Sequence, residues 1–184
     1  MTKNTVPPTE QDHLLGQPTG RIQLLEYADY QCPHSAAARA ILGDVLPTLG
    51  AEVSYVFRNF PLPDLHPRAV EAAEAAEAAG AQGKFWEMHN LLFKHQDQFS
   101  ADDLTRYAKQ LGLDVERFTR ELTEHTYLPR IASDVANGVR SGVPGTPTFF
   151  VNGARVEGTF EAEALRDLLV AQIAAAGPPA PAAR

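Results

Sequence analysis

The chain has 184 residues, of which 44% are hydrophobic and 21% charged, a mix typical of a globular protein with a core of its own. A formal net charge of −7 argues against a sequence-independent grip on nucleic acid. No apolar run reaches about 18 residues, which argues against a membrane-spanning helix. With a single cysteine, Cys32, the chain cannot form an internal disulfide.

Both ends of the chain are poor in large apolar residues. Residues 1–20 are rich in Pro, Thr, Gln and Gly, and we expect a flexible N-terminal arm there. We expect residues 177–184, which are rich in Pro and Ala, to form a flexible tail. The first residues also lack the apolar core of a signal peptide. The sequence therefore predicts a cytoplasmic protein, or a periplasmic or otherwise extracytoplasmic one from which an export signal has been removed.

A strand, a helix and a second strand are expected in residues 21–65. Residues 21–28 and 51–60 are short segments rich in β-forming residues, and in the second Val53, Tyr55 and Phe57 alternate with polar side chains. Residues 33–49 suit a helix with Pro33 in its first turn, although Pro47 is expected to kink or end it. Such a unit favours parallel strand pairing with a right-handed crossover.

Residues 66–127 have the character of an inserted helical subdomain. They are rich in Ala and Glu and then carry large apolar residues at helical spacing. Ser100 and Asp114 are N-cap signals, each at the beginning of an amphipathic helix. One more helix is predicted over residues 128–142, ending at Gly142.

Two short strands and a last helix complete the chain. Residues 146–153 and 154–160 indicate strands joined at Asn152-Gly153, a pair typical of a tight hairpin, and residues 161–176 indicate an amphipathic helix. Because the first strands need a crossover and the hairpin must be antiparallel, we predict an α/β fold with a mixed central sheet flanked by helices. Its main domain consists of residues 21–65 and 128–176.

Cys32 stands where the first predicted strand ends and the first helix begins, in the segment YADYQCPHS. The free amides and the dipole at the beginning of a helix stabilise an anion, so a thiol there ionises readily and becomes a nucleophile. A protonated His34 would add to this effect, whereas Asp29 and Glu26 would oppose it if they faced the sulfur. A lone cysteine is more often a small buried apolar residue, but this setting favours an accessible, reactive thiol.

A second, distant segment, SGVPGTPTFFVNG, carries Pro147 directly before a predicted strand. Proline is admissible there if its missing donor is not needed. Because cis X–Pro bonds are rare in folded proteins, the residues alone predict an ordinary trans peptide bond between Thr146 and Pro147.

The segments DYQCPHS and GTPTFFVNG, with the helical block between them, resemble the DsbA-like thioredoxin-fold family. VFRNFPL, HPRAVEAAEAAEAAGAQGKFWEMHNLLF and SGVPGTPTFFVNG also resemble its subgroup called thioredoxin-4. The resemblance covers residues 20–172 and implies a thioredoxin fold with an inserted helical subdomain. It further implies that the Thr146–Pro147 bond is cis and packs near Cys32.

The chain departs from the family pattern at Ser35, where the resemblance implies a second, resolving cysteine. Pro33 and His34, between the two positions, match the family's strongly oxidising members. An alcohol cannot resolve a mixed disulfide, so an outside thiol such as glutathione must release Cys32. Three explanations stay open. Ser35 is natural and the protein is a monothiol enzyme, or it is an engineered replacement of cysteine, or the protein has lost redox catalysis.

The sequence therefore predicts a thiol–disulfide oxidoreductase whose partners are protein or glutathione thiols and disulfides. The residues that this hypothesis places at the site are Cys32, Pro33, His34, Ser35, Thr146 and Pro147. The alternative is a redox-inactive, chaperone-like module that holds peptides in a groove lined by these same residues. We expect no metal and no cofactor, because the six histidines lack metal-ligand spacing and no phosphate-binding loop occurs.

Overall fold

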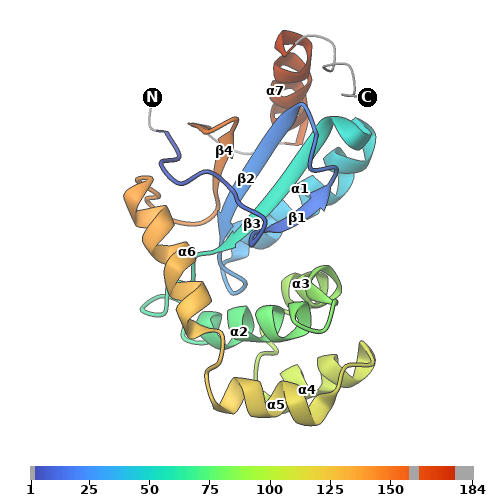
Figure 1. Cartoon of the computed structure of the whole chain (residues 1–184), viewed down its shortest axis with the longest axis vertical. Coiled ribbons are helices and arrows are strands. Elements are labelled where there is room, and N and C mark those ends of the chain that lie inside the picture. The colour runs from blue at the N-terminus through green and yellow to red at the C-terminus, as the bar shows by residue number, and fades with distance from the viewer. Residues whose placement is uncertain (1–2, 158–161, 177–184) are drawn as a thin grey trace.

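The computed structural model describes residues 3–157 and 162–176, and at its centre is a mixed five-stranded sheet in the order β1-β3-β2-β4-β5 (Figure 1). Strands β2 and β3 pair in parallel, as the strand–helix–strand unit predicted, and the other neighbouring strands pair antiparallel. The strands are β1 (His13–Gly16), β2 (Ile22–Ala28), β3 (Val53–Asn59), β4 (Thr148–Val151) and β5 (Ala154–Arg155).

Helices surround this sheet and form a separate layer below it in the view of Figure 1. Helices α2 to α5 gather in that lower layer, whereas α1, α6 and α7 flank the sheet. The division of the chain into a main domain and an insertion at residues 66–127 stays a prediction. Within the described residues, the helices are α1 (Pro33–Leu49), α2 (Ala69–Gly80), α3 (Phe85–Lys94), α4 (Ala101–Gln110), α5 (Val115–Thr123), α6 (Leu128–Arg140) and α7 (Ala162–Ala175).

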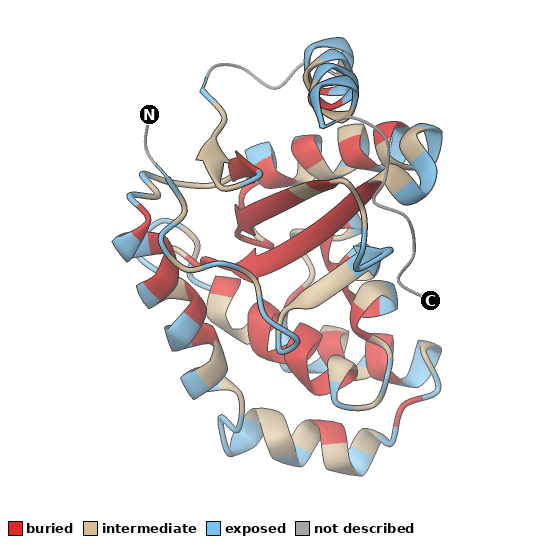
Figure 2. Ribbon diagram, turned by 45° about the horizontal axis from the view of Figure 1, so that its top comes forward, coloured by how far each residue is buried: buried red, intermediate tan, exposed pale blue. Residues whose placement is uncertain are grey.

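The two faces of the sheet pack against different layers, because successive side chains of a strand point to opposite faces. On β3, Tyr55 and Phe57 belong to the larger apolar cluster, which α1 and the lower helices share. Val56 joins Tyr27 and Phe150 in a smaller cluster that packs against residues of α6 and the segment after it. Strands β2, β3 and β4 are accordingly buried along most of their length, whereas the edge strands β1 and β5 are not, and the outer faces of the helices are exposed (Figure 2).

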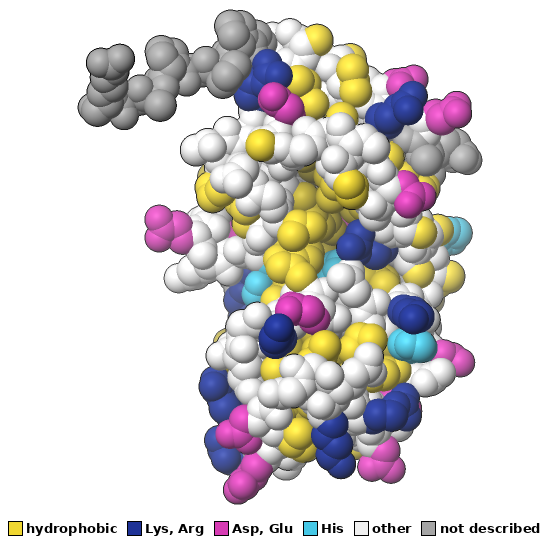
Figure 3. Space-filling view, turned by 90° about the vertical axis from the view of Figure 1, so that its right-hand side faces the viewer, with side chains coloured by type: hydrophobic (Ala, Val, Ile, Leu, Met, Phe, Trp, Pro, Cys, Tyr) yellow, Lys and Arg dark blue, Asp and Glu magenta, His cyan; other side chains and the backbone are white. Residues whose placement is uncertain are grey.

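The surface carries no broad region of one charge on the face shown in Figure 3. Apolar side chains gather in a hollow at the middle of that face, and basic and acidic side chains are interspersed over the helical part below it. Because charges of both signs are interspersed, this face offers no long-range field of one sign.

The hairpin and the two helix caps are confirmed. Asn152 and Gly153 both have positive φ, 49° and 80°, as a two-residue turn between right-twisted strands requires. Ser100 Oγ accepts a hydrogen bond from the backbone N–H of Asp103, and the carboxylate of Asp114 accepts one from the N–H of Arg117. The strand predicted over residues 154–160 is shorter than expected, since β5 ends at Arg155 and residues 158–160 lie outside the described part.

The N-terminal segment corrects the expectation of a flexible arm over residues 1–20. In its described part, residues 13–16 form β1 and pair with β3. Ahead of β1, Asp12 accepts hydrogen bonds from Arg58, and the carbonyl oxygens of Val6 and Pro7 accept two more. A buried guanidinium requires acceptors for its donors, and this requirement holds the segment in place. The tail expected at residues 177–184 lies outside the described residues.

Pro47 does not end α1, so of the two effects expected of this proline, a kink or an end, the second does not occur. The helix continues to Leu49 and ends at Gly50, which has a φ of 57°. The missing N–H of Pro47 would leave the carbonyl of Gly43 without its helical partner, but Gly43 is exposed, so water can serve instead. The helix predicted over residues 128–142, by contrast, is two residues shorter than expected. It ends at Arg140, and Gly142 follows at positive φ.

Candidate active site

Cys32 is the N-cap residue of α1, at the point where the turn after β2 becomes helical. Its backbone is extended, with φ −75° and ψ 121°, and its carbonyl oxygen accepts the first bond of the helix from Ala36 N–H at 3.1 Å. Pro33 occupies the first helical turn, where its missing N–H costs nothing. The side chain of Cys32 therefore lies at the beginning of a helix, although it accepts no capping hydrogen bond from the helix amides.

The thiol faces the loop before β4. Cys32 Sγ donates to the carbonyl oxygen of Thr146 over 3.3 Å, and the Thr146–Pro147 peptide bond is cis. Both features were implied by the family resemblance and are confirmed, whereas the base rate for X–Pro bonds gave the wrong isomer. The hydroxyl oxygen of Thr146 is buried and has no hydrogen-bond partner among the described residues. The structure thus brings Cys32, Thr146 and Pro147 together.

The four residues of the Cys32–Ser35 motif differ in their exposure. Cys32 is only 4% exposed, so the accessible thiol that the sequence predicted is in fact covered. Pro33 and His34 are exposed, and Ser35 is fully buried with its hydroxyl 3.5 Å from the N–H of Asp29. The burial of Cys32 follows from its contact with the Thr146 loop, which could not be inferred from local sequence.

Asp29 fixes the turn that leads into Cys32. Its carboxylate accepts the N–H of Gln31 on one oxygen, at 2.7 Å. The other oxygen accepts the N–H of Leu62 at 2.9 Å and contacts Nδ1 of His66 at 2.8 Å. Through these bonds Asp29 joins the turn before α1 to the segment after β3. The carboxylate oxygens of Asp29 are thus bound by Gln31, Leu62 and His66 rather than by Cys32.

Gln96, in the segment after α3, holds the same turn from the helical layer. Its Nε2 donates to the carbonyl oxygens of both Tyr30 and Cys32 at 2.8 Å. Sequence reasoning missed both Gln96 and His66. Each contacts a residue more than about 30 positions away, and no local signal marks an amide or imidazole for such a role.

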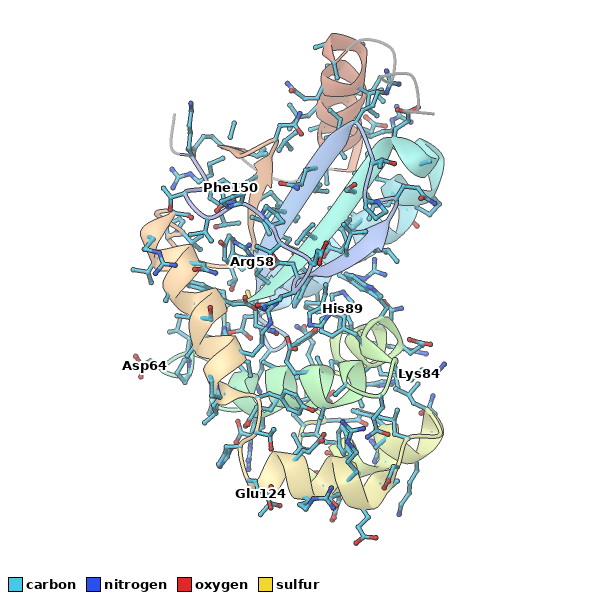
Figure 4. The ribbon with its side chains drawn as sticks, viewed as in Figure 1. Arg58, Asp64, Lys84, His89, Glu124 and Phe150 are labelled. Atoms are coloured by element: carbon cyan, nitrogen blue, oxygen red, sulfur yellow. The ribbon has the colours of Figure 1, made fainter. Side chains whose placement is uncertain are left out.

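Two buried polar groups lie below the turn. Burial raises the pKa of Glu26 to about 7, against the opposing effect of a hydrogen bond from the hydroxyl of Tyr55. Burial lowers the pKa of His89 well below its ordinary value, so its imidazole is neutral and pairs through Nδ1 with the hydroxyl of Tyr30. His89 lies between the sheet and the helical layer (Figure 4). One carboxylate oxygen of Glu26 is thus bound by Tyr55, whereas the other, Oε1, is buried and has no hydrogen-bond partner among the described residues.

Arg58, near the end of β3, has a buried side chain. Its side chain is 2% exposed and forms an ion pair with Asp12, with Nε 2.7 Å from a carboxylate oxygen. Its Nη1 also donates to the hydroxyl of Tyr27 at 2.9 Å. Figure 4 shows Arg58 at the sheet, whereas Asp64, Lys84 and Glu124 lie at the periphery. Arg58 is therefore a structural cation.

The chemistry available to this site is that of one thiol. Among residues 3–157 and 162–176, no group of three or more His, Cys, Asp or Glu side chains could hold a metal ion. Cys32 can attack or be attacked at sulfur, and no second thiol of the same chain can complete an exchange.

Curated relatives share most of this chain but are much longer. The chain is 45% identical over 167 residues to Na(+)/H(+) antiporter NhaA 3 of Salinispora tropica, a match that covers 91% of this chain and 26% of the antiporter. It is 42% identical over 158 residues to Na(+)/H(+) antiporter NhaA 1 of a Mycobacterium species, covering 85% and 26%. The chain therefore spans about a quarter of these relatives. In the described part of the chain, no helix has the length and apolar character needed to cross a membrane.

Solved structures of similar architecture come from thiol–disulfide proteins. A thioredoxin-like oxidoreductase from Silicibacter pomeroyi superimposes with a TM-score of 0.76 at 29% identity, covering 91% of this chain and 94% of that one. Wolbachia pipientis alpha-DsbA1 gives 0.77 at 21% identity, covering 96% and 98%. Oxidised BdbD from Bacillus subtilis gives 0.75 at 20% identity, covering 88% and 92%. The latter two show that the fold is shared.

A family model decides the assignment. The model Thioredoxin_4, described as thioredoxin, matches residues 8–171 and so includes Cys32, Ser35 and the Thr146–Pro147 loop. The mixed sheet, the cis bond beside the cysteine and the structural neighbours all agree with it. The chain therefore belongs to the Thioredoxin_4 family and has the thioredoxin fold of DsbA-like oxidoreductases, as its motifs predicted.

Proposed function

We propose that this chain catalyses thiol–disulfide exchange through the single thiol of Cys32. The observation that carries the proposal is the position of Sγ, beside the first turn of α1 and 3.3 Å from the carbonyl oxygen of Thr146. The beginning of a helix is a position at which reactive cysteines occur, and the Thr146–Pro147 loop offers a backbone along which a substrate polypeptide can lie. Membership of the family supports the same class of chemistry.

The exchange proceeds in two balanced steps. The thiolate of Cys32 attacks one sulfur of a substrate disulfide, the old S–S bond breaks, and the other sulfur leaves as a thiolate. Cys32 and the substrate are then joined in a mixed disulfide. Since Ser35 carries no thiol, a thiol of glutathione or of another protein attacks next. It takes over the substrate's sulfur in a new disulfide and releases Cys32 as a thiolate. Pro33 and His34, which are exposed next to Cys32, lie at the edge of the site where this exchange takes place.

A second candidate function is a peptide-holding module without redox turnover. The specific observation in its favour is the burial of Cys32, which is 4% exposed, together with the complete burial of Ser35. In this alternative Cys32 is a small apolar residue covered by the Thr146 loop, and the surface beside that loop binds polypeptide without reacting with it.

The decisive experiment compares the folded chain with a synthetic peptide of residues 27–40. Both are treated with glutathione disulfide, and the rate at which Cys32 gains glutathione is followed by mass spectrometry. Exchange catalysis requires the folded chain to react at least about tenfold faster than the peptide, despite the burial of its sulfur. Cys32→Ser should form no adduct, and added glutathione should release the adduct of the wild type over repeated cycles. If the folded chain gains glutathione more slowly than the synthetic peptide, and Cys32→Ser still binds an unfolded polypeptide, the peptide-holding module is established instead.

We do not extend ion transport to this chain, since it matches only 26% of the length of the named antiporters. The two locations predicted from the sequence, cytoplasmic or extracytoplasmic, both stay predictions.

A further inference from the structure

A pocket of about 190 Å³ lies between α2, α4 and α5 in the helical layer. Its apolar wall includes Phe99, Leu104 and Leu122, and its polar wall includes Glu74 and His125. Cofactor and drug-sized sites usually measure about 300–1,000 Å³. The pocket is therefore of a size for one side chain rather than for a cofactor.

Glu74 is the unusual group in this pocket. Its side chain is 1% exposed, and Oε2 is 3.0 Å from Nδ1 of His125. The other oxygen, Oε1, is buried and has no hydrogen-bond partner among the described residues. A buried carboxylate oxygen without a hydrogen-bond donor costs the folded chain free energy. A ligand that donates a hydrogen bond to this oxygen removes that cost, which adds to its affinity. Burial also raises the pKa of Glu74, which a bound cation would counteract.

The charged neighbours of Glu74 leave that oxygen free. Arg68 also lines the pocket, but its Nη1 already pairs with Oε1 of Glu71 at 3.1 Å. His125 is largely exposed and reaches only the other oxygen of Glu74. An apolar wall that ends in a carboxylate acceptor suits a side chain with an aliphatic stem and a cationic head.

The pocket is tied to the turn that carries Cys32. The N–H of Arg68 donates to the side-chain oxygen of Gln31 at 2.8 Å. Phe99 follows Gln96, whose amide holds the carbonyl oxygen of Cys32 at 2.8 Å. Two walls of the pocket thus belong to segments that bond directly to the residues around the thiol.

We propose that this pocket receives a lysine or arginine side chain of the polypeptide that reacts with Cys32. The aliphatic stem packs against Phe99, Leu104 and Leu122, and the cationic head donates to Oε1 of Glu74. The pocket thereby selects protein substrates with a basic residue near their cysteine. This inference rests on the proposed thiol–disulfide exchange and names its substrate class.

The test uses glutathionylated peptides with one cysteine, in which a single lysine is moved stepwise from one side of the cysteine to the other. A matching series has glutamine in place of lysine. The rate of peptide transfer to Cys32 is measured for the wild type, for Glu74→Gln and for Glu124→Gln. Glu124 is an exposed residue just beyond α5, so its variant removes the same charge outside the pocket.

We expect the wild type to prefer lysine over glutamine at one position by about tenfold, the factor that corresponds to 1.4 kcal/mol. Glu74→Gln should abolish this preference, and Glu124→Gln should keep it. Glu124→Gln should react with glutathione disulfide at the wild-type rate, which shows that Cys32 is intact. Both variants should have the circular dichroism spectrum and the urea-unfolding midpoint of a folded chain.

Equal rates for lysine and glutamine peptides at every position in the wild type would overturn the inference, whatever the variants do. Equal loss of preference in both variants would also overturn it, because a diffuse negative field would then be responsible. If Cys32 reacts with no disulfide at all, the proposed exchange itself fails. Titration calorimetry of Cys32→Ser with the lysine and glutamine peptides then decides on the pocket separately, and equal affinities would reject it.

Discussion

The sulfur of Cys32 and the carbonyl oxygen of Thr146 are 3.3 Å apart, although 114 positions separate the two residues in the chain. The contact joins the beginning of α1 to the loop before β4 and covers the thiol. It explains how a cysteine can be largely buried and still stand at the amide-rich beginning of a helix. Exchange at this sulfur requires the substrate to enter beside the Thr146 loop.

Ser35→Cys should convert the site into a dithiol. Position 35 lies in the first turn of α1 and is fully buried next to the turn that carries Cys32. On treatment with glutathione disulfide we expect the variant to lose both thiol hydrogens and to retain no glutathione, as mass spectrometry would show. Ala37→Cys, at an exposed position of the same helix, is the control and should retain glutathione. A Ser35→Cys chain that stays glutathionylated would contradict this expectation.

Glu26 should make the protein less stable as the pH rises towards neutrality. Burial raises the pKa of Glu26 to about 7 and that of Asp134 to about 6. Below these pKa values the folded chain holds carboxyl protons that the unfolded chain has released, so Glu26 and Asp134 lower the free energy of unfolding from about pH 4.5 to about pH 7. His89 opposes this decline up to about pH 6.5, because its buried imidazole stays neutral in the folded chain and binds a proton in the unfolded one. Between pH 6 and 7 the contribution of Glu26 alone is a loss of about 1 kcal/mol.

Glu26→Gln keeps an acceptor for Tyr55 and should flatten the decline between pH 6 and 7. Urea unfolding at a series of pH values measures it. Glu124→Gln, at an exposed position, should leave the slope unchanged. If Glu26→Gln has the wild-type slope, the carboxyl group of Glu26 does not titrate in this interval.

Gly138→Ala should destabilise the chain, because α6 approaches the sheet closely at this residue. A Cβ atom added at Gly138 would lie 2.6 Å from the ring of Phe60, which itself packs edge-on against Tyr27. We expect a loss of about 1–3 kcal/mol from overpacking, measured by urea unfolding. Gly43→Ala, in an exposed part of α1 with room for a methyl group, should instead gain about 0.5–1 kcal/mol. Equal effects of the two substitutions would refute the close approach.

Asp12→Asn should be far more damaging than the loss of a surface ion pair. The substitution leaves the guanidinium of Arg58 buried without its carboxylate, and breaking a buried pair in this way costs about 3–5 kcal/mol. Glu52→Gln breaks the more exposed pair with Arg21 and should cost less than about 1 kcal/mol. Denaturant unfolding compares the two. Limited proteolysis should cut residues 3–12 faster in Asp12→Asn, and unchanged cleavage would show that Arg58 does not anchor this segment.

Local signals predicted the elements that depend on neighbouring residues. Asn152-Gly153 gave the hairpin, and Ser100 and Asp114 gave two helix beginnings, because turns and caps are decided within a few positions. The prediction of a flexible arm before β1 was wrong because the order of this segment depends on a distant residue. That residue is Arg58, 46 positions after Asp12, and a buried cation cannot be recognised from a strand's alternation alone.

At the candidate site, too, local signals were predictable from the sequence and contacts between distant segments were not. The motif around Cys32 and the family resemblance predicted the thiol, the helix beginning and the cis bond. The burial of Cys32, the bonds from Gln96 and the contact of Asp29 with His66 depend on segments that meet only in the folded chain. Such contacts leave no periodicity or spacing in the sequence.

The single amide nitrogen of Gln96 that binds both Tyr30 and Cys32 makes the thiol turn and the helical layer mechanically one unit. A ligand that pushed the segment after α3 outward would pull on two carbonyl groups of the turn at once and shift the sulfur relative to Thr146. Together with the bond from Arg68 to Gln31, Gln96 therefore links the helical layer directly to the turn that holds the thiol.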